Sequence, residues 1–288
     1  MLRGLYTAAS GMQAQQRFHD TVTNNITNLN TPGFKASAVV NRSFPNMLIS
    51  AMGGPNQSSD KVGRLSTGVF AEENLMLMTQ GDLKQTHRYQ DMALVSDVLV
   101  PGAVFDGSGK YVDPNGQVTY QPQAYFSVLT PQGGEQYTRD GSFKTASDGT
   151  LVTSEGFPVL GADGQPIITN VAWDNITVAA NGSLVDASTG EAIDGNPQLR
   201  LMLVNNPNEL LRSGDGLFSY TGEAAGIRQV DANDRVEVKQ GFLEGSNVNA
   251  AQSAVDIMSA LRAYEANQKV IQFYDRSLDK AVNEVGKV

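Results

Sequence analysis

Hydrophobic positions recur with a seven-residue period at both ends of the 288-residue chain. In the first thirty residues they step alternately by three and by four, which is the spacing of one helix face that packs against another helix. No proline precedes Pro32, so the spacing predicts a helix that begins near the N-terminus. Its stripe consists of Leu5, Ala8, Met12, Gln15, His19, Val22, Ile26 and Leu29.

The last forty residues repeat this pattern. The pattern predicts a helix from about residue 249 to residue 285. Asn249 followed by Gln252 fits a loose capping box at its start, and Ser246 or Asn247 could serve as the N-cap instead. Such a helix is roughly 55 Å long at 1.5 Å per residue, and this length favours a coiled coil. Its stripe consists of Ala254, Ile257, Leu261, Tyr264, Gln268, Ile271, Asp275, Leu278, Val282 and Val285.

A turn sequence follows the first predicted helix. Pro32 disfavours helical angles at Thr31, Gly33 permits a turn, and Phe34 is a large apolar side chain that can anchor the exit. We therefore assign Thr31, Pro32, Gly33 and Phe34 to a turn that ends the helix.

The middle of the chain has a different sequence pattern. Residues 51–70 are rich in Gly, Ser and polar residues and indicate an extended connector. From residue 93 to residue 240, short β-like runs such as "AYFSVLT", "LRLMLVN" and "DRVEVKQ" alternate with tight-turn sequences such as "DPNGQ" and "GADGQP". This alternation predicts a domain of antiparallel hairpins.

The predicted fold class is α+β. Two amphipathic helices at opposite ends of the sequence have no other helix to cover their stripes, so they are expected to form an antiparallel coiled-coil-like core with a mainly antiparallel β domain inserted between them. The expected organisation is an N-terminal helix in 1–35, a connector in 36–92, a β-rich domain in 93–240 and a C-terminal helix in 241–288.

The first helix is weakly favoured by its own residues. Six Thr and Asn residues between Thr21 and Asn28 each cost about 0.5 kcal/mol relative to Ala, or roughly 3 kcal/mol together. Burial of the apolar stripe returns about 1.5–3 kcal/mol per large side chain, but only against a partner surface. We expect the terminal helices to be loosely ordered in the free monomer and to order on assembly; a stable two-helix stalk on a monomer is the alternative.

Composition and charge exclude several classes of protein. The chain has no cysteine, so disulfides and thiolate chemistry are absent. The net charge is −9, and residues 51–240 alone hold 12 basic and 23 acidic residues, which disfavours nucleic acid or anionic lipid as a partner. No apolar run has the length of a signal peptide or of the roughly 20 residues that span a membrane, so no membrane insertion is expected.

No catalytic, cofactor or metal motif stands out. His19 and His87 are the only histidines, and His19 lies on the predicted helix stripe. The sequence contains no H-E-x-x-H motif, and the Gly-Lys of "FDGSGKY" fails as a phosphate-binding loop because Val104 and Tyr111 replace the required Gly and Ser or Thr. We therefore expect no enzyme activity, no cofactor, no metal and no small-molecule substrate.

Three stretches resemble one known family. "MLRGLYTAASGMQAQQ" followed by "NNITNLNTPGFKA" is similar to the N-terminal signature of the bacterial flagellar rod and hook–basal body proteins. Residues 137–167 resemble the β segment of the rod members, and residues 241–282 resemble their C-terminal helix. The likeness is greatest to the proximal or distal rod type, particularly of Gram-positive bacteria. The chain departs from the family pattern after Thr86, where residues 87–123 form a longer segment, and this leaves its position in the rod open.

The resemblance implies a structural subunit of the flagellar basal-body rod. Such subunits leave the cytoplasm unfolded through the flagellar type III export apparatus, without a signal peptide. They polymerise helically, pack their terminal helices into an inner tube, and transmit torque from motor to hook. The implied partners are further copies and other rod or hook subunits, and the implied location is the basal body outside the cytoplasmic membrane.

The expected working residues are therefore those of interfaces. The N-terminal set is Leu5, Met12, Val22, Ile26 and Leu29, and the C-terminal set is Leu261, Tyr264, Ile271, Leu278 and Val282. A second interpretation of the same pattern is a secreted fibre or adhesin module with a coiled-coil stalk, which would form a discrete dimer or trimer. A third is an enzyme such as a wall hydrolase.

Overall fold

The computed structural model describes residues 2–50, 61–98, 100–106, 109–193, 195–231 and 233–286. Its internal contacts divide the chain into two units. Unit 1 comprises the described residues of Met1–Thr27, Ser37–Leu75 and Asn249–Val288, and unit 2 those of Asn28–Ala36 and Met76–Val248. Part of the predicted connector, residues 51–60, lies outside the described residues.

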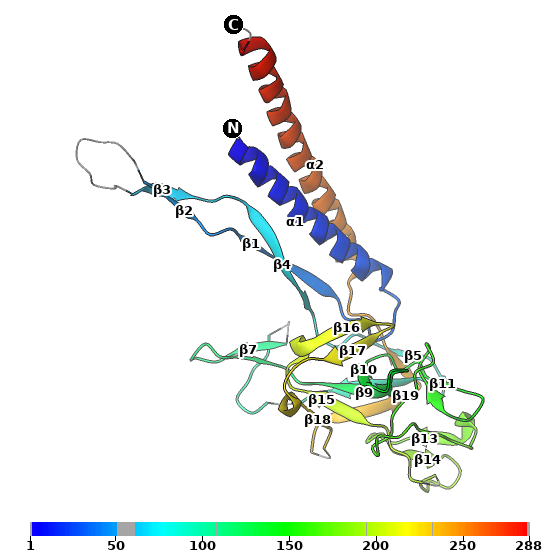
Figure 1. Ribbon diagram of the computed structural model, residues 1–288. Coiled ribbons are helices and arrows are strands. Elements are labelled where there is room, and N and C mark those ends of the chain that lie inside the picture. The colour runs from blue at the N-terminus through cyan, green and yellow to red at the C-terminus, as the bar shows by residue number, and fades with distance from the viewer. Residues whose placement is uncertain are drawn as a thin grey trace. The chain divides into compact units, whose positions relative to one another are not determined.

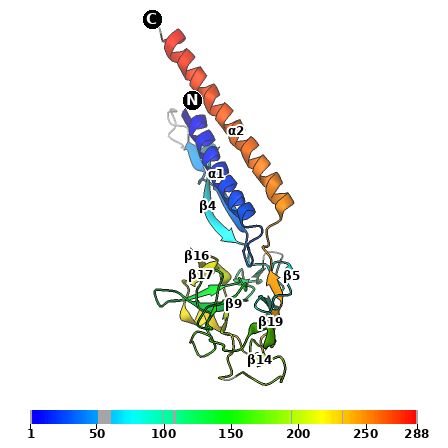
Figure 2. The same ribbon diagram turned by 90° about the vertical axis from the view of Figure 1, so that its right-hand side faces the viewer.

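Unit 1 contains both long helices. Helix α1 is Leu2–Thr27 and helix α2 is Ala250–Lys280, which continues as a π-helix over Ala281–Val285. Figures 1 and 2 show the two helices side by side, with the N- and C-termini at the same end of the pair, so the helices run antiparallel. The predicted start of the second helix is confirmed, because the Asn249 side chain accepts a hydrogen bond from the Gln252 backbone N–H.

Paired strands follow α1 in unit 1. Strand β1 (Ser37–Ser43) pairs with β4 (Val69–Met76), and β2 (Met47–Ser50) pairs antiparallel with β3 (Lys61–Leu65). Within the predicted connector of residues 36–92, the chain therefore satisfies backbone hydrogen bonds in strand pairs, whereas an extended connector would leave them to water.

Two polar side chains of α1 bind these strands. The Asn25 amide bonds both backbone groups of Ser37, at 2.8 Å to its carbonyl and 2.9 Å to its N–H. Arg17 Nη1 donates to the Ala71 carbonyl at 3.1 Å. Asn25 lowers the helix propensity of α1. Its side-chain amide, however, supplies the two hydrogen bonds that the Ser37 backbone would otherwise receive from a neighbouring strand.

Unit 2 is built on a six-stranded antiparallel sheet with the order β16-β17-β10-β9-β15-β18. The predicted strands "AYFSVLT", "LRLMLVN" and "DRVEVKQ" are confirmed as β9, β15 and β19. The sheet strands are β9 (Gln123–Leu129), β10 (Glu135–Thr138), β15 (Leu201–Val204), β16 (Leu210–Gly214), β17 (Leu217–Tyr220) and β18 (Ile227–Gln229).

Five two-stranded pairs complete the described strands of unit 2. Three short 3-10 helices lie between strands, at Trp173–Asn175, Pro207–Glu209 and Ala224–Gly226. The pairs are β5 (Leu83–Gln85) with β20 (Phe242–Glu244), β6 (Met92–Ser96) with β19 (Val236–Gln240), β7 (Lys110–Val112) with β8 (Val118–Tyr120), β11 (Lys144–Thr145) with β12 (Leu151–Val152), and β13 (Ile176–Val178) with β14 (Leu184–Asp186).

The larger of two buried hydrophobic clusters in the described part of unit 2 spans the central sheet and the surrounding strand pairs. It buries residues from the central sheet, from β6 and β19, and from the loops between the short strands. Phe126 and Phe143 meet edge to face in it, with ring centroids 5.1 Å apart. The predicted turns are also present, since Gly116 of "DPNGQ" and Gly164 of "GADGQP" both have positive φ.

The predicted fold class is confirmed in its coarse form: the protein is mixed helix and strand, with antiparallel sheets and one long helix near each end of the sequence. The division of the chain differs from the expected one. Residues 37–75 group with the helices, whereas the turn after α1 groups with the β-rich unit.

Candidate assembly surfaces and a buried ion network

Glycines of α1 set the close approach of the two helices. A Cβ atom built on Gly4 would collide with the Tyr274 hydroxyl oxygen, and one on Gly11 would lie 3.0 Å from Asn267 Nδ2. Both steps, from Gly4 to Gly11 and from Asn267 to Tyr274, are seven residues. The two helices therefore meet with the same period on both sides, and α1 has no side chain at these two contact points.

The predicted N-terminal stripe lies on the less exposed side of α1. Val22 is buried, and Leu5, Met12 and Ile26 are half-buried. Leu29 is also half-buried, but it follows the end of the helix at Thr27 and belongs to unit 2.

The C-terminal stripe is shifted in part. Tyr264, Ile271 and Leu278 are half-buried, as a position on the helix contact requires. Every second position of the observed stripe lies one residue before the predicted one. The less exposed residues there are Ser253, Ala260, Asn267, Tyr274 and Ala281. Most of these are small residues, which fit a close approach of the two helix backbones better than leucine and valine do.

Large apolar side chains consequently remain on the outside of α2. Leu261 is 46% exposed, and Phe273 and Val282 are each 70% exposed. Val255, Met258 and Val270 of the same helix are exposed as well. A helix that keeps this much apolar surface after packing on α1 has surface to bury against another molecule.

The helix-exit turn docks into unit 2. Gly33 has a φ of +67°, and a Cβ there would lie 2.5 Å from the Arg139 carbonyl carbon, so both conformation and space require glycine. Its N–H donates to the Glu244 carbonyl at 2.8 Å. Phe34 lies under the Arg212 guanidinium, 4.4 Å from the ring centroid. Thr31 and Pro32 are half-buried in the same turn.

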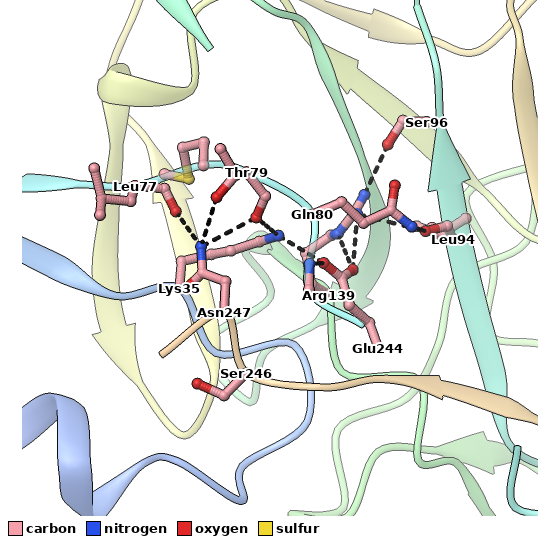
Figure 3. A network of polar contacts seen from close by, with 12 residues as sticks. Lys35, Leu77, Thr79, Gln80, Leu94, Ser96, Arg139, Glu244, Ser246 and Asn247 are labelled. Carbon is pink, nitrogen blue, oxygen red and sulfur yellow. Dashed lines mark hydrogen bonds and ion pairs between the residues drawn. The ribbon is translucent and has the colours of Figure 1, made fainter. Parts of the chain in front are cut away.

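A buried ion network lies beside this turn (Figure 3). Glu244 Oε1 accepts hydrogen bonds from Lys35 Nζ at 2.6 Å and from the Gly81 N–H at 2.9 Å. Its Oε2 accepts a hydrogen bond from Arg139 Nε at 2.8 Å and forms an ion pair with Arg139 Nη2 at 2.7 Å. The side chains of these three charged residues are at most 1% exposed. The carboxylate therefore has a partner for each of the four lone pairs that it can offer.

Backbone carbonyls and one amide complete the network. Lys35 Nζ also donates to the Thr79 carbonyl at 2.9 Å, and Arg139 Nη1 donates to the Ala124 carbonyl at 2.6 Å and to Ser96 Oγ. Asn247 accepts from the Ala36 N–H at 2.6 Å and donates to the carbonyls of Leu77 and Thr79, as Figure 3 shows in part.

The charges of the network depend on one another. Burial lowers the pKa of Lys35 from 10.5 to about 8, and the Arg139 charge lowers it too, while Glu244 acts in the opposite direction. Burial alone would raise the pKa of Glu244, but the charges of Arg139 and Lys35 outweigh it and hold that pKa below its ordinary value of 4.5. At neutral pH the network therefore holds one carboxylate between two cations.

The network joins three segments that are distant in the sequence. The chain crosses between the two units four times: before and after residues 28–36, before Met76, and after Val248. Lys35 lies in the first of these segments, Thr79 just after the third crossing, and Glu244 and Asn247 just before the last. Every chain connection into unit 2 is thus tied to the same carboxylate within that unit.

Acidification is expected to weaken unit 2 through Glu244. The folded pKa of Glu244 lies below 4.5, so the unfolded chain binds its proton first as the pH falls. The stabilisation is complete above pH 4.5 and is lost as the pH falls through the folded pKa. Urea unfolding, followed by fluorescence of the single tryptophan, Trp173, measures this. Glu244→Gln should show a flatter pH dependence below pH 4.5, and parallel curves for the two proteins would contradict the assignment.

The described residues offer little for other chemistry. No group of three or more His, Asp or Glu side chains in them is placed to hold a metal ion. Neither long helix combines the length and the apolar character that crossing a membrane requires, as far as the structure describes them.

Three family models match the chain. The model of the flagella basal body rod protein matches residues 5–35, that of the flagellar hook protein FlgE/F/G D1 domain matches residues 121–187, and that of the flagellar basal body rod FlgEFG protein C-terminal matches residues 239–284. These ranges cover α1 with its exit turn, the β9–β14 part of unit 2, and β20 with α2.

Curated relatives match over nearly the whole length. The flagellar hook-basal body complex protein FlhO of Bacillus subtilis is 35% identical over 293 aligned positions, with both chains fully covered. The flagellar basal-body rod protein FlgG of Borreliella burgdorferi is 33% identical with 98% of each chain covered. FlhP of Bacillus subtilis, another hook-basal body complex protein, is 30% identical with 96% and 97% covered. With such identity over its full length, the chain belongs to the family of flagellar basal-body rod and hook–basal body proteins.

Proposed function

We propose that this chain is a structural subunit of the flagellar basal-body rod, which polymerises helically and transmits torque from the motor to the hook. The observation that carries the proposal is the exposed apolar surface of α2, including Leu261 and Phe273, which remains after α2 has packed on α1. In a rod, neighbouring copies and other rod or hook subunits bury this surface. The protein acts by mechanical contact, without an active site.

The finer parts of the proposal concern the helices. We assign the α1–α2 pair to the inner tube, as an antiparallel coiled-coil-like core whose seven-residue period matches the contacts of Gly4 and Gly11. The interface residues are Leu5, Met12, Val22, Ile26, Leu29, Leu261, Tyr264, Ile271, Leu278 and Val282. Export through the flagellar type III apparatus before folding places the subunit outside the cytoplasmic membrane.

The ion network fits a mechanical role. A force between the units passes along the chain segments that connect them, and the network holds these segments together inside unit 2. Buried charge pairs with complete hydrogen bonding are rigid and specific in geometry, although they add less net stability than their Coulomb energy suggests.

Charged substitutions on the outer face of α2 should abolish motility. Leu261→Asp combined with Phe273→Asp leaves the contact with α1 unchanged, because both side chains are exposed in the single chain. Swimming in soft agar should be lost, since two carboxylates must then be buried between subunits at a cost of several kcal/mol each. Gln272→Asp, an exposed polar position nearby, is the control. Normal swimming of the double variant would contradict the interface.

A deletion strain tests the function as a whole. Cells that lack this chain should stop basal-body growth at the rod and carry neither hook nor filament, as seen by electron microscopy of isolated basal bodies. Complete filaments in that strain would overturn the proposal. A discrete dimer or trimer of the purified protein, in place of a helical polymer, would instead fit the stalked fibre.

A further inference from the structure

The hairpin of β7 and β8, residues Lys110–Tyr120, has two valines on one face that the described part of unit 2 leaves about half exposed. The two strands form a sheet of their own, and Figure 1 shows β7 standing apart from β9 and β10. A two-stranded hairpin is only marginally stable in water. Exposed valines on such a hairpin lower its stability further unless another surface covers them.

The cross-strand pairing assigns each side chain to a face. Val112 pairs with Val118, and Lys110 pairs with Tyr120. Because alternate residues of a strand point to the same side, these four side chains share one face. Val112 is 51% exposed and Val118 is 41% exposed.

The opposite face of the hairpin is already occupied. Tyr111 and Thr119 pair on that side. The Phe105 ring lies edge to face on Tyr111, with centroids 6.5 Å apart. The valine face is therefore the one that remains open.

Unit 2 also contains a hollow of matching chemistry, which we call the groove. Its volume is about 760 Å³, and it lies beside β18, the edge strand of the central sheet, and the β6–β19 pair. Its apolar lining includes the buried Leu199, Leu201 and Val236, and also Val230. The exposed part of its lining holds more acidic than basic side chains, with Asp97, Asp231 and Glu237 against Arg235, and the half-buried Asp234 lies beside them.

The charges of the two surfaces are complementary. In the groove, Asp234 and Asp231 are paired with Arg228, but Asp97 and Glu237 have no ion pair within the described chain. On the hairpin, Lys110 is the only basic side chain between residues 100 and 122, and it has no ion pair either. The hairpin's Asp113 is engaged in its own turn, where it accepts from the N–H groups of Asn115 and Gln117.

We propose that the hairpin of one copy docks in the groove of a second copy, with Val112 and Val118 over the apolar lining and Lys110 facing Asp97 and Glu237. The two surfaces differ, so the contact is heterologous, and repetition of it along a series of copies builds an open helical polymer. This inference rests on the proposed function, and it names one contact by which neighbouring subunits recognise each other.

Single-cysteine cross-linking tests the contact, because the chain has no cysteine of its own. Val112→Cys and Glu237→Cys are expressed as two separate chains in one cell, and basal bodies are isolated and oxidised. A disulfide requires Cα atoms within about 7 Å, so a dimer of twice the 30.8 kDa chain should form. Thr119→Cys with Glu237→Cys is the matched control, since Thr119 lies on the other face. We expect at least about tenfold less dimer from the control, through its lower effective concentration.

The outcomes separate this contact from the proposed function. Equal cross-linking from Val112 and Thr119, or none from either, overturns the docking. A third pair, Leu261→Cys with Phe273→Cys in separate chains, reports helix-mediated assembly in the same preparation, so a dimer there with none at the hairpin leaves the rod subunit standing. A charge reversal adds an independent test: Lys110→Glu should reduce motility, and Asp97→Lys with Glu237→Lys should restore it. Failure of the rescue would also count against the docking.

Discussion

Replacing Glu244 with glutamine should lower the free energy of unfolding of unit 2 by about 3–5 kcal/mol. In a site that excludes water, the carboxylate accepts hydrogen bonds from Lys35, Arg139 Nε and the Gly81 N–H, and it forms a further ion pair with Arg139 Nη2. Removing its charge leaves two buried cations without compensation, and the amide offers one NH₂ group where an acceptor is needed. The loss is a large fraction of the 5–15 kcal/mol by which ordinary domains are stable.

Urea unfolding of the full chain measures this, because the single tryptophan, Trp173, is buried in unit 2. Asp234→Asn is the matched control: Asp234 also binds an arginine through both oxygens, but Arg228 is 41% exposed and therefore screened by water, so the loss should be well below that of Glu244→Gln. Lys35→Met leaves the Arg139–Glu244 pair intact and should fall between the two. An effect of Glu244→Gln as small as that of Asp234→Asn would show that the network contributes little to holding the chain segments together.

The sequence predicted the features that depend on local pattern. The start of α2 at Asn249 was predictable because an N-cap is a contact over three residues. The strands β9, β15 and β19 were predictable from short β-branched and apolar runs, and Gly116 and Gly164 from turn chemistry. Half of the C-terminal stripe, including Ile271 and Leu278, also follows from the period alone.

Other features depend on contacts that no local pattern contains. Lys35 and Glu244 are 209 positions apart, and neither residue differs in sequence context from an ordinary surface charge. On α2, the buried residue at the helix contact is Ala260, whereas the sequence pattern predicts its neighbour Leu261. The small side chain permits a closer approach of the two helices. Only the seven-residue spacing of Gly4 and Gly11 could have indicated the close helix contact from the sequence. Helix propensity alone suggests instead that these glycines weaken the helix.

Those glycines lead to the second large effect: Gly11→Leu should abolish motility. Leucine is the better helix former by roughly 0.8 kcal/mol, so propensity alone predicts a more stable α1. The Cβ atom would already lie 3.0 Å from Asn267 Nδ2, and the rest of the leucine side chain extends further into α2. The helices must separate, and the surface that they present to neighbouring subunits changes with them.

Three comparisons make the result specific to the helix contact. Gln13→Leu introduces the same side chain at an exposed position of α1 and should leave swimming unchanged. Asn267→Ala in the Gly11→Leu background removes the colliding amide and should restore part of the motility. Unfolding followed at Trp173 should be the same in all of these variants, since Trp173 reports on unit 2. Wild-type swimming of Gly11→Leu would mean that the close approach of α1 and α2 at Gly11 is dispensable, and the assembly surface would then have to be sought on the strands of unit 1 or in unit 2.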